Sequence, residues 1–323
     1  MIYKPPFELN SKIFQLSQDV SKEIGMLAGA KLDIPSVKLR RMNNIRTIQA
    51  SLAIEGNTLS LDQVTHIFDG KQIIGPKKDI LEVQNAISVY EKLKSFNCVE
   101  INDFLEAHSI LMSNLTKNAG SWRNSGVGVF KGKIVAHMPP PAKRVPNLMR
   151  DLFDFLKNDE SVGWLLKGCI FHYELEFIHP FTDGNGRMGR LWQQIILMKE
   201  DEVFAFLPVE EMIKKNQDVY YNVLSECDQE GSSTKFIEFS LAQILVALKD
   251  YRSITYVDAR DMKSRLKYAF LKMENIWFSR KDYMSIHRDI STSTASRDLT
   301  YGLGEKTLQS KGGKNQTMYR FCN

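Results

Sequence analysis

The chain has 323 residues, of which 43% are hydrophobic and 25% charged, an ordinary composition for a soluble globular protein with one large domain and a smaller one. No apolar run approaches the ~18 residues that a membrane span needs, and the first ten residues lack the apolar core of a signal peptide. Four widely spaced cysteines without a C-x-x-C pair indicate neither a zinc knuckle nor a disulfide framework. We therefore expect a cytoplasmic protein with reduced thiols and no membrane partner.

The net charge of +5 is unevenly distributed along the chain. Residues 260–323 contain 13 Lys and Arg against 6 Asp and Glu, whereas the first 259 residues contain 30 against 32. A basic tail of this kind is compatible with a solvated surface or with an acidic partner such as nucleic acid.

Helical periodicity dominates the first 250 residues. Apolar residues recur at three- and four-residue intervals in four segments, which predicts amphipathic helices that pack into a bundle. These segments are 81–96, 101–115, 146–158 and 236–251. A fifth segment, 164–178, is apolar nearly all round and predicts a central, buried helix.

Only two places have a β pattern. In 126–141, two short β-branched runs flank "KGK" as in a hairpin, and three prolines stop the second run. The other lies at the extreme C-terminus. The predicted fold class is therefore all-α, with one hairpin and a small C-terminal domain beginning near 251–261.

The predicted buried helix leads directly into "HPFTDGNGRMGR", residues 179–190. A helix that begins just after Gly184 would offer its first backbone N–H groups to an anion, and small residues there allow a close approach. Arg187 and Arg190 are three apart on the same predicted helix, so both guanidinium groups could reach further phosphate oxygens. The pattern favours an anion with several phosphates.

Two further side chains in this stretch suggest chemistry on a phosphate. Asp183 precedes the glycines and is a hard oxygen ligand suited to Mg²⁺ that bridges phosphates. His179 could accept a proton from an attacking hydroxyl. A histidine taken alone is more often a hydrogen-bonded core residue, but the combination predicts nucleophilic attack on a nucleotide phosphate.

Other phosphate-binding motifs fit less well. Gly184, Gly186 and Gly189 satisfy G-x-G-x-x-G, yet a long helix precedes them where a dinucleotide-binding unit needs a strand. The sequence contains no G-x-x-x-x-G-K-[S/T] loop. An NAD-dependent oxidoreductase is thus a distant alternative.

The stretch resembles the signature H-x-F-x-[D/E]-G-N-G-R-x-x-R of the Fic domain. All of its specified positions are filled, by His179, Phe181, Asp183, Gly184, Asn185, Gly186, Arg187 and Arg190. The resemblance implies an α-helical protein adenylyltransferase, which transfers AMP from ATP to a Ser, Thr or Tyr hydroxyl of a target protein or of itself. A phosphotransferase branch of the family replaces small residues of this turn, so retention of Gly184 and Gly186 favours adenylyl transfer.

The resemblance also implies residue roles. His179 would be the general base, Asp183 would hold Mg²⁺, the turn from Gly184 to Gly186 would bind phosphates, and Arg190 would meet the γ-phosphate. The hairpin resembles the family's flap, whose edge strand aligns the target, although it could also be a simple surface hairpin. Residues 219–224 would lie around the adenine, with core packing as the alternative. The full ATP-binding set comprises Gly184, Asn185, Gly186, Arg187, Met188, Gly189, Arg190, Val135, Ala136, His137, Met138, Tyr220, Tyr221 and Asn222.

Upstream, "SLAIEGN" (51–57) resembles the family's inhibitory motif [S/T]-x-x-x-E-[G/N], with Ser51, Glu55 and Gly56 matching. Ser51 and Glu55 are four apart, which places them on one face of a helix that Gly56 would stop. The Glu55 carboxylate could then pair with Arg190 in place of γ-phosphate oxygens. Taken alone, so short a motif would more often be an exposed glutamate near a helix end. Its inhibitory role implies low activity at rest and leaves open whether Glu55 also supports removal of AMP.

The tail, 290–321, resembles a winged helix-turn-helix, with Ser291 to Tyr301 as recognition helix and Lys311 to Asn315 as wing. Such domains bind DNA or proteins. The rival interpretation is a DNA-binding regulator in which the Fic fold only senses nucleotide. The sequence also leaves open whether the chain forms a homodimer.

The expected organisation has three parts. Residues 1–110 form an N-terminal helical region with the inhibitory motif, and 111–250 form the catalytic core with the flap and the signature. Residues 258–323 form the winged-helix domain.

Overall fold

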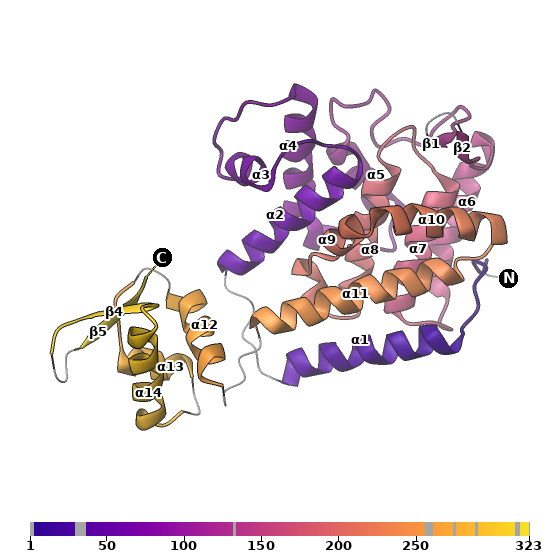
Figure 1. Ribbon diagram of the computed structural model, residues 1–323. Coiled ribbons are helices and arrows are strands. Elements are labelled where there is room, and N and C mark those ends of the chain that lie inside the picture. Colours follow the sequence, from indigo (N-terminus) through magenta and orange to yellow (C-terminus); the bar gives the residue numbers. More distant parts are fainter. Residues whose placement is uncertain are drawn as a thin grey trace. The chain divides into compact units, whose positions relative to one another are not determined.

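A computed structural model describes residues 3–29, 37–131, 134–255, 261–273, 276–287, 290–313 and 317–322 (Figure 1). They divide into two compact units. The larger unit contains residues 3–26 and 37–249, and the smaller one contains 27–29 and the described residues from 250 onward. Nearly all of the expected regions 1–110 and 111–250 therefore lies in one unit.

Two helices joined by the signature turn form the centre of the larger unit. These are α7 (Trp164–Ile178) and α8 (Asn185–Leu197). The prediction of a buried helix at 164–178 is confirmed, because α7 is buried over most of its length. Glycines let the pair approach closely: a Cβ at Gly168 would lie 3.2 Å from the Leu197 side chain. One at Gly189 would lie 2.7 Å from the ring of His172.

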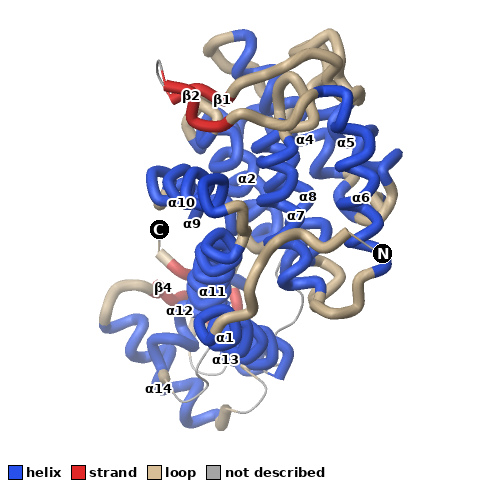
Figure 2. The backbone as a smooth tube through the Cα atoms, turned by 90° about the vertical axis from the view of Figure 1, so that its right-hand side faces the viewer, coloured by secondary structure: helices blue, strands red, loops and turns tan. Residues whose placement is uncertain are grey.

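Nine further helices of the described chain pack around this pair. They are α1 (Ser11–Gly29), α2 (Val37–Ile54), α3 (Leu61–Phe68), α4 (Lys77–Glu91), α5 (Ile101–Leu111), α6 (Val145–Asn158), α9 (Val209–Lys215), α10 (Gln217–Glu230) and α11 (Thr234–Thr255). Helices α1 and α11 run side by side (Figures 1 and 2), and Lys12 Nζ lies 2.7 Å from the Glu238 carboxylate. The four predicted amphipathic helices are confirmed with shifted ends. Helix α5 stops at Leu111 and not at 115, because the chain turns there and Asn114 adopts a left-handed backbone.

Aromatic rings fill the core next to the signature turn. Phe104 from α5 packs 5.5 Å from Phe181 in the turn and 5.0 Å from Trp192 of α8 (centroid to centroid). Both Phe104 and Phe181 are fully buried. The turn is therefore anchored by burial of Phe181, which contributes roughly 1.5–3 kcal/mol.

The predicted hairpin is present at the margin of the helical bundle (Figure 2). Strand β1 (Val129–Lys131) pairs antiparallel with β2 (Ile134–His137), and Lys131 lies opposite Ile134.

The smaller unit combines three helices with a three-stranded sheet. Its elements are α12 (Met262–Met273), β3 (Phe278–Ser279), α13 (Arg280–Ile286), α14 (Thr292–Gly304), β4 (Leu308–Lys311) and β5 (Met318–Phe321). The strand order is β3-β5-β4, all antiparallel. The predicted helix at 291–301 is confirmed, and the β pattern at the C-terminus corresponds to β4 and β5. Strand β3 was not predicted, and Lys314 and Asn315 of the expected wing lie outside the described residues.

A buried ion pair lies in the interior of this unit. The Arg265 guanidinium donates to both carboxylate oxygens of Asp298 at 2.6 and 2.7 Å, and the Tyr283 hydroxyl donates to the same carboxylate at 3.0 Å. All three side chains are buried.

Within the ranges given above, no helix combines the length and apolarity that a bilayer crossing requires.

Candidate active site

The signature turn begins where α7 ends. His179 is the residue that caps α7, with a left-handed backbone (φ 49°), and its N–H donates to the Leu175 carbonyl at 2.9 Å. This conformation is uncommon for a residue with a side chain. The half-buried imidazole has Nδ1 3.4 Å from the carbonyl oxygen of Glu176. The backbone reversal therefore fixes the imidazole at the junction of α7 and α8.

Asn185 holds the turn closed. Its buried side chain accepts from the Phe181 N–H and donates to the Phe181 carbonyl, both at 2.9 Å. Asn185 thus braces the loop ahead of α8 and is not itself free to bind a ligand through its side chain. The first residues of α8 are left with their backbone N–H groups at the helix start, where an anion is favoured.

His108 was not among the expected site residues, and it supports the signature turn through hydrogen bonds. Its Nδ1 accepts from the Gly120 N–H at 2.8 Å, so Nε2 carries the proton and donates to the Asp183 carbonyl at 3.0 Å. The ring stacks on Phe181 at 3.5 Å, and burial lowers the pKa of His108 to about 4. A neutral imidazole is therefore retained at physiological pH.

Gly184, the residue before α8, must be glycine for two reasons. Its φ is +86°, a region that L side chains rarely adopt. A Cβ there would also lie 2.7 Å from the sulfur of Met112.

Asp183 fits a single-carboxylate ligand for Mg²⁺. Its side chain is 53% exposed, and one oxygen, Oδ1, accepts from the Gly184 N–H at 2.6 Å and from Arg187 at 2.9 Å. Nowhere in the described ranges do three or more His, Cys, Asp or Glu converge as a metal site. Mg²⁺ commonly takes one or two carboxylates and completes its shell with waters and substrate phosphates. The donor set at Asp183 suits that mode of binding.

Arg187 differs from the expectation that it reaches phosphate oxygens. Its buried guanidinium lies between Asp183 and Glu82 of α4, with a distance of 3.2 Å to the Glu82 carboxylate. Glu82 also accepts from the Asn57 side chain at 2.9 Å. A buried cation requires such partners, so Arg187 connects the signature helix to α4 and to the turn after α2.

Arg190 is held by the segment that resembles the inhibitory motif. Its Nη2 lies 2.7 Å from the Glu55 carboxylate, and its Nε donates to the Ser51 hydroxyl at 3.1 Å. Burial by itself lowers the pKa of Arg190, but Glu55, Tyr220 and Glu176 more than offset this and raise it. The guanidinium therefore stays charged while 1% exposed.

Glu55 lies one residue past α2, which ends at Ile54, and not within the helix as expected. The Glu55 N–H donates to the Leu52 carbonyl at 3.0 Å, and Gly56 follows with φ 91°. This turn still brings Glu55 and Ser51 to the same guanidinium. It also places the Glu55 carboxylate over the start of α8, because a Cβ at Gly186 would lie 2.5 Å from Glu55 Oε1.

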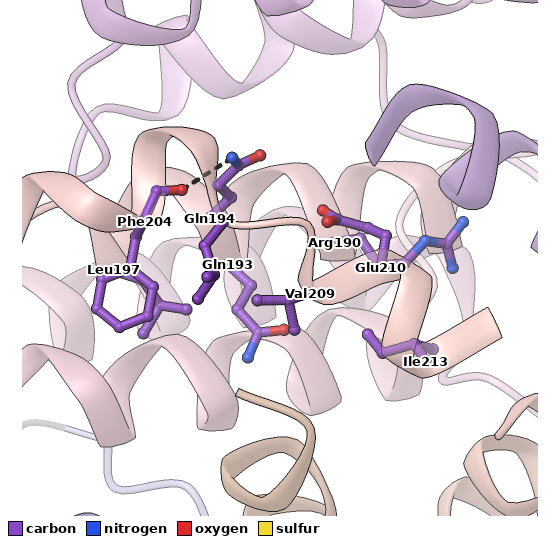
Figure 3. A pocket seen from close by; sticks show the side chains of 9 residues that line it. Arg190, Gln193, Gln194, Leu197, Phe204, Val209, Glu210 and Ile213 are labelled. Atoms are coloured by element: carbon purple, nitrogen blue, oxygen red, sulfur yellow. Dashed lines mark hydrogen bonds between the residues drawn. The ribbon is translucent and has the colours of Figure 1, made fainter. Parts of the chain in front are cut away.

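A small cavity of about 10 Å³ is lined in part by Arg190 (Figure 3). Glu210 of α9 and Gln194 of α8 line it with Arg190. Counting partners among the described residues only, Glu210 Oε2, Arg190 Nη1 and Gln194 Oε1 make no hydrogen bond. The volume suits one water, and burial raises the pKa of Glu210 to about 7.

Three residues of the expected ATP-binding set belong to the core. Met188 is fully buried, Gly189 faces His172 across the α7–α8 contact, and Tyr220 is 1% exposed. The Tyr220 hydroxyl lies 3.1 Å from His172 Nε2. The side chains of Met188 and Tyr220 are turned inward by the rotation of their helices, and Gly189 contributes no side chain.

The other expected residues are placed at the surface. Tyr221 is partly exposed and donates to the Ile54 carbonyl at 3.3 Å, and Asn222 is exposed. Met138, just after β2, is 69% exposed. For Val135, Ala136 and His137 the backbone lies in β2, and their side chains fall outside the described part of the structure.

A helical bundle with this turn between two buried helices is the architecture of Fic proteins. The model of the "Fic/DOC family" matches residues 98–197. A Fic family protein from Desulfovibrio desulfuricans G20, solved by crystallography, is 38% identical in sequence. The match covers 99% of this chain and 98% of that one, with a TM-score of 0.74. The chain therefore belongs to the Fic family.

Curated relatives carry enzyme names. "Protein adenylyltransferase fic-1" of Caenorhabditis elegans is 35% identical over 54% of this chain. "Protein adenylyltransferase Fic" of Nematostella vectensis is 31% identical over 71% of it. The chain spans 36% and 54% of the lengths of these two relatives, respectively.

Proposed function

We propose that this protein is an adenylyltransferase that moves AMP from ATP to a hydroxyl side chain of a protein and releases pyrophosphate. The observation that carries the proposal is the complete turn between α7 and α8. It combines the half-buried imidazole of His179, the half-exposed carboxylate of Asp183 and an anion-binding helix start. The names of the two curated relatives support the same activity.

In the proposed reaction, ATP places its phosphates against the turn from Gly184 to Gly186, where α8 begins, and its γ-phosphate at Arg190. His179 accepts the proton of the attacking hydroxyl. The hydroxyl oxygen then bonds to the α-phosphorus as the bond from that phosphorus to the bridging α–β oxygen breaks, and pyrophosphate leaves. Mg²⁺ held by Asp183 would supply neutralisation of phosphate charge.

We further propose that Glu55 inhibits the protein at rest. The ion pair with Glu55 uses the donor of Arg190 that a γ-phosphate would need, and the carboxylate lies next to Gly186. Two anions cannot share that position at low cost. The proposal extends to hydrolytic removal of AMP, for which Glu55 would orient a water. Loss of label from AMP-modified protein tests that extension.

The test compares ATP labelled at the α-phosphate with ATP labelled at the γ-phosphate. Adenylyl transfer predicts protein labelled only by the α-label, dependent on Mg²⁺ and lost on addition of a chelator. His179→Ala should lose the label while still binding ATP, because general-base loss typically costs about 10²- to 10⁴-fold. Labelling by the γ-phosphate, or an unchanged rate in His179→Ala, would overturn the proposal.

A second candidate function, contact with DNA, concerns the smaller unit. The exposed side chains of α14, together with that of the preceding residue, are four hydroxyl groups and one arginine. These are Ser291, Thr292, Ser293, Thr300 and Arg297. Hydroxyl groups, cations and a helix start are the groups that contact phosphate backbones.

Two cations also lie on the sheet of the same unit. The Lys311 ammonium lies 4.1 Å, and the Arg320 guanidinium 5.4 Å, from the Trp277 ring centroid. DNA binding predicts affinity for duplexes that falls steeply with salt, because phosphate contacts release counterions. Absence of binding at low salt would leave protein recognition, including homodimerisation, as the role of the unit. Light scattering of the free protein measures homodimerisation.

The presence of both His179 and Asp183 favours an enzyme over a regulator that only senses nucleotide, since a sensor needs no base. The need for ATP and the four free cysteines fit the cytoplasmic location expected from the sequence.

A further inference from the structure

Arg123 is a buried arginine between α5 and the hairpin. Its side chain is 3% exposed, and no described carboxylate pairs with it. Burial accordingly lowers the pKa of Arg123. Burying a cation without an ion-pair partner costs free energy unless its N–H groups are hydrogen-bonded. The hydrogen-bond partners of Arg123 therefore indicate its structural role.

The described hydrogen-bond partners of the Arg123 guanidinium are all backbone carbonyls, and they belong to two separate segments of the chain. At the end of α7, its Nε donates to the His179 carbonyl at 2.7 Å and Nη2 lies 3.4 Å from the Ile178 carbonyl. At the base of the hairpin, Nη1 donates to the Ser125 carbonyl at 3.0 Å and Nη2 donates to the Pro140 carbonyl. One planar group therefore joins the two ends of the hairpin to the residue that carries the imidazole.

The position suits a guanidinium for electrostatic and geometric reasons. The last carbonyls of a helix carry partial negative charge, so a cation at the end of α7 is stabilised. His179 has a left-handed backbone, a conformation that costs about 1–2 kcal/mol and persists only when its surroundings hold it. Arginine offers five donors in a fixed plane, whereas lysine offers a point charge that cannot reach four carbonyls at once.

We propose that Arg123 is a positioning residue that sets the hairpin in register with His179, so that a hydroxyl aligned along β2 meets the imidazole. This inference rests on the proposed adenylyl transfer and on the hairpin as the element that aligns the target. Arg123 acts only through backbone carbonyls and contacts neither nucleotide nor target. Its loss should therefore lower the rate of transfer and spare ATP binding.

The experiment uses the Glu55→Gly protein as background and compares Arg123→Lys and Arg123→Met with a matched control, Lys167→Met. Lys167 is also a buried cation, 5% exposed, whose ammonium donates to a backbone carbonyl, that of Leu156, at 2.9 Å. The transfer rate at saturating ATP should fall about 10-fold or more in both Arg123 variants, because small misplacement of reacting groups is costly. The Kd for ATP should stay within about 2-fold of the background protein.

Hydrogen exchange gives a readout that does not depend on activity. In Arg123→Lys, the amides at both ends of the hairpin and those at the end of α7 should exchange faster together, and in Lys167→Met they should not. If the background protein itself fails to transfer AMP, the proposed function is wrong. The exchange data then still test whether Arg123 joins the hairpin to the end of α7. Full transfer in Arg123→Lys, an equal loss in Lys167→Met, or loosening of the hairpin without α7 would each overturn the inference.

Discussion

The Nη2 atom of Arg190 lies 2.7 Å from Oε1 of Glu55, a residue 135 positions earlier in the chain. The two partners are buried to different extents: the side chain of Arg190 is 1% exposed and that of Glu55 is 31% exposed. Glu55 can therefore regain water when it leaves, whereas Arg190 would remain a buried cation in need of another anion. In the proposed reaction a γ-phosphate meets that need, so under this proposal the Glu55 carboxylate competes with the substrate for Arg190.

Replacing Glu55 with glycine should activate the protein. The change removes the competing carboxylate at a position just outside α2, where glycine is tolerated, so little stability should be lost. We expect self-labelling with ATP and Mg²⁺ to rise by at least ~10-fold, equivalent to ~1.4 kcal/mol of barrier. The initial rate of label incorporation measures this.

Two controls accompany this prediction. Glu91→Gly removes an exposed glutamate at the end of α4 and should leave labelling unchanged. Glu55→Gly combined with His179→Ala should be inactive, because the base is lost. A folded Glu55→Gly protein that binds ATP but labels no faster than the wild type would show that Glu55 does not inhibit.

Gly189→Ala should destabilise the protein without weakening ATP binding. The new Cβ would lie 2.7 Å from the ring of His172, and that ring is held by Gln193 at 2.6 Å and by Tyr220 at 3.1 Å. Because the ring cannot move aside easily, we expect a loss of about 1–3 kcal/mol in the free energy of unfolding. Denaturant titration measures the loss.

Gly25→Ala is the matched control, since a Cβ at this helical glycine meets nothing within 4 Å. It should be neutral or stabilising by up to about 1 kcal/mol. If Gly189→Ala kept its stability and lost ATP affinity, Gly189 would be part of the nucleotide site after all.

The sequence was most informative where the site is local. The residues from His179 to Gly186 lie in one short turn that its own glycines and Asn185 help to close, so their proximity could be anticipated from spacing. The pairing of Arg190 with Glu55 joins distant segments, and it was anticipated only through a resemblance to a known motif; the bond from Arg190 to the Ser51 hydroxyl was not anticipated.

Tertiary contacts between ordinary residues could not be predicted. His108 and Glu82 lie in amphipathic helices, where a polar residue has many possible partners and its spacing does not select one. Proximity in sequence also assigned Arg187 and Gly189 to the ligand. In the structure, α8 turns Gly189 toward α7, and Arg187 toward Asp183 and Glu82, because successive residues of a helix point about 100° apart.

Stability should depend on pH through Glu210. Burial raises the pKa of its carboxyl to about 7, above the ordinary value of 4.5, so the folded protein binds the proton more tightly than the unfolded chain does. The resulting stabilisation is present at low pH and is lost as pH rises through 7. Glu210→Gln keeps the neutral shape and should remove this dependence.

The measurement is the difference in free energy of unfolding between Glu210→Gln and wild type at pH 5 and pH 8. This difference should change by roughly 2 kcal/mol in favour of the variant at the higher pH. Taking differences cancels the opposing contributions of buried His108 and His172, whose pKa values burial lowers to about 4 and about 3. A difference that is constant with pH would mean that Glu210 ionises as an exposed carboxyl does.

The turn that carries Glu55 is itself anchored to α4, and Asn57 is one of the residues that make this contact. The Asn57 side chain donates to the Asp79 carbonyl at 3.1 Å and to the Glu82 carboxylate at 2.9 Å. Asn57→Ala removes both bonds to α4, each worth about 0.5–1.5 kcal/mol and more where the partner is charged, and also the bond that Asn57 Oδ1 accepts from the Leu59 N–H at 3.1 Å. The turn should then release Glu55 more often, and since populations follow free energies, basal labelling should rise by a factor of several.

This increase should stay below that of Glu55→Gly, because the carboxylate is still present and can still return to Arg190. The double change Asn57→Ala with Glu55→Gly separates release of Glu55 from any other effect. Once the carboxylate is gone, loosening the turn has nothing further to release, so the double variant should label as fast as Glu55→Gly alone. If Asn57→Ala instead raised labelling equally in both backgrounds, its effect would come from Glu82 and Arg187, and the turn would not be what holds Glu55 in place.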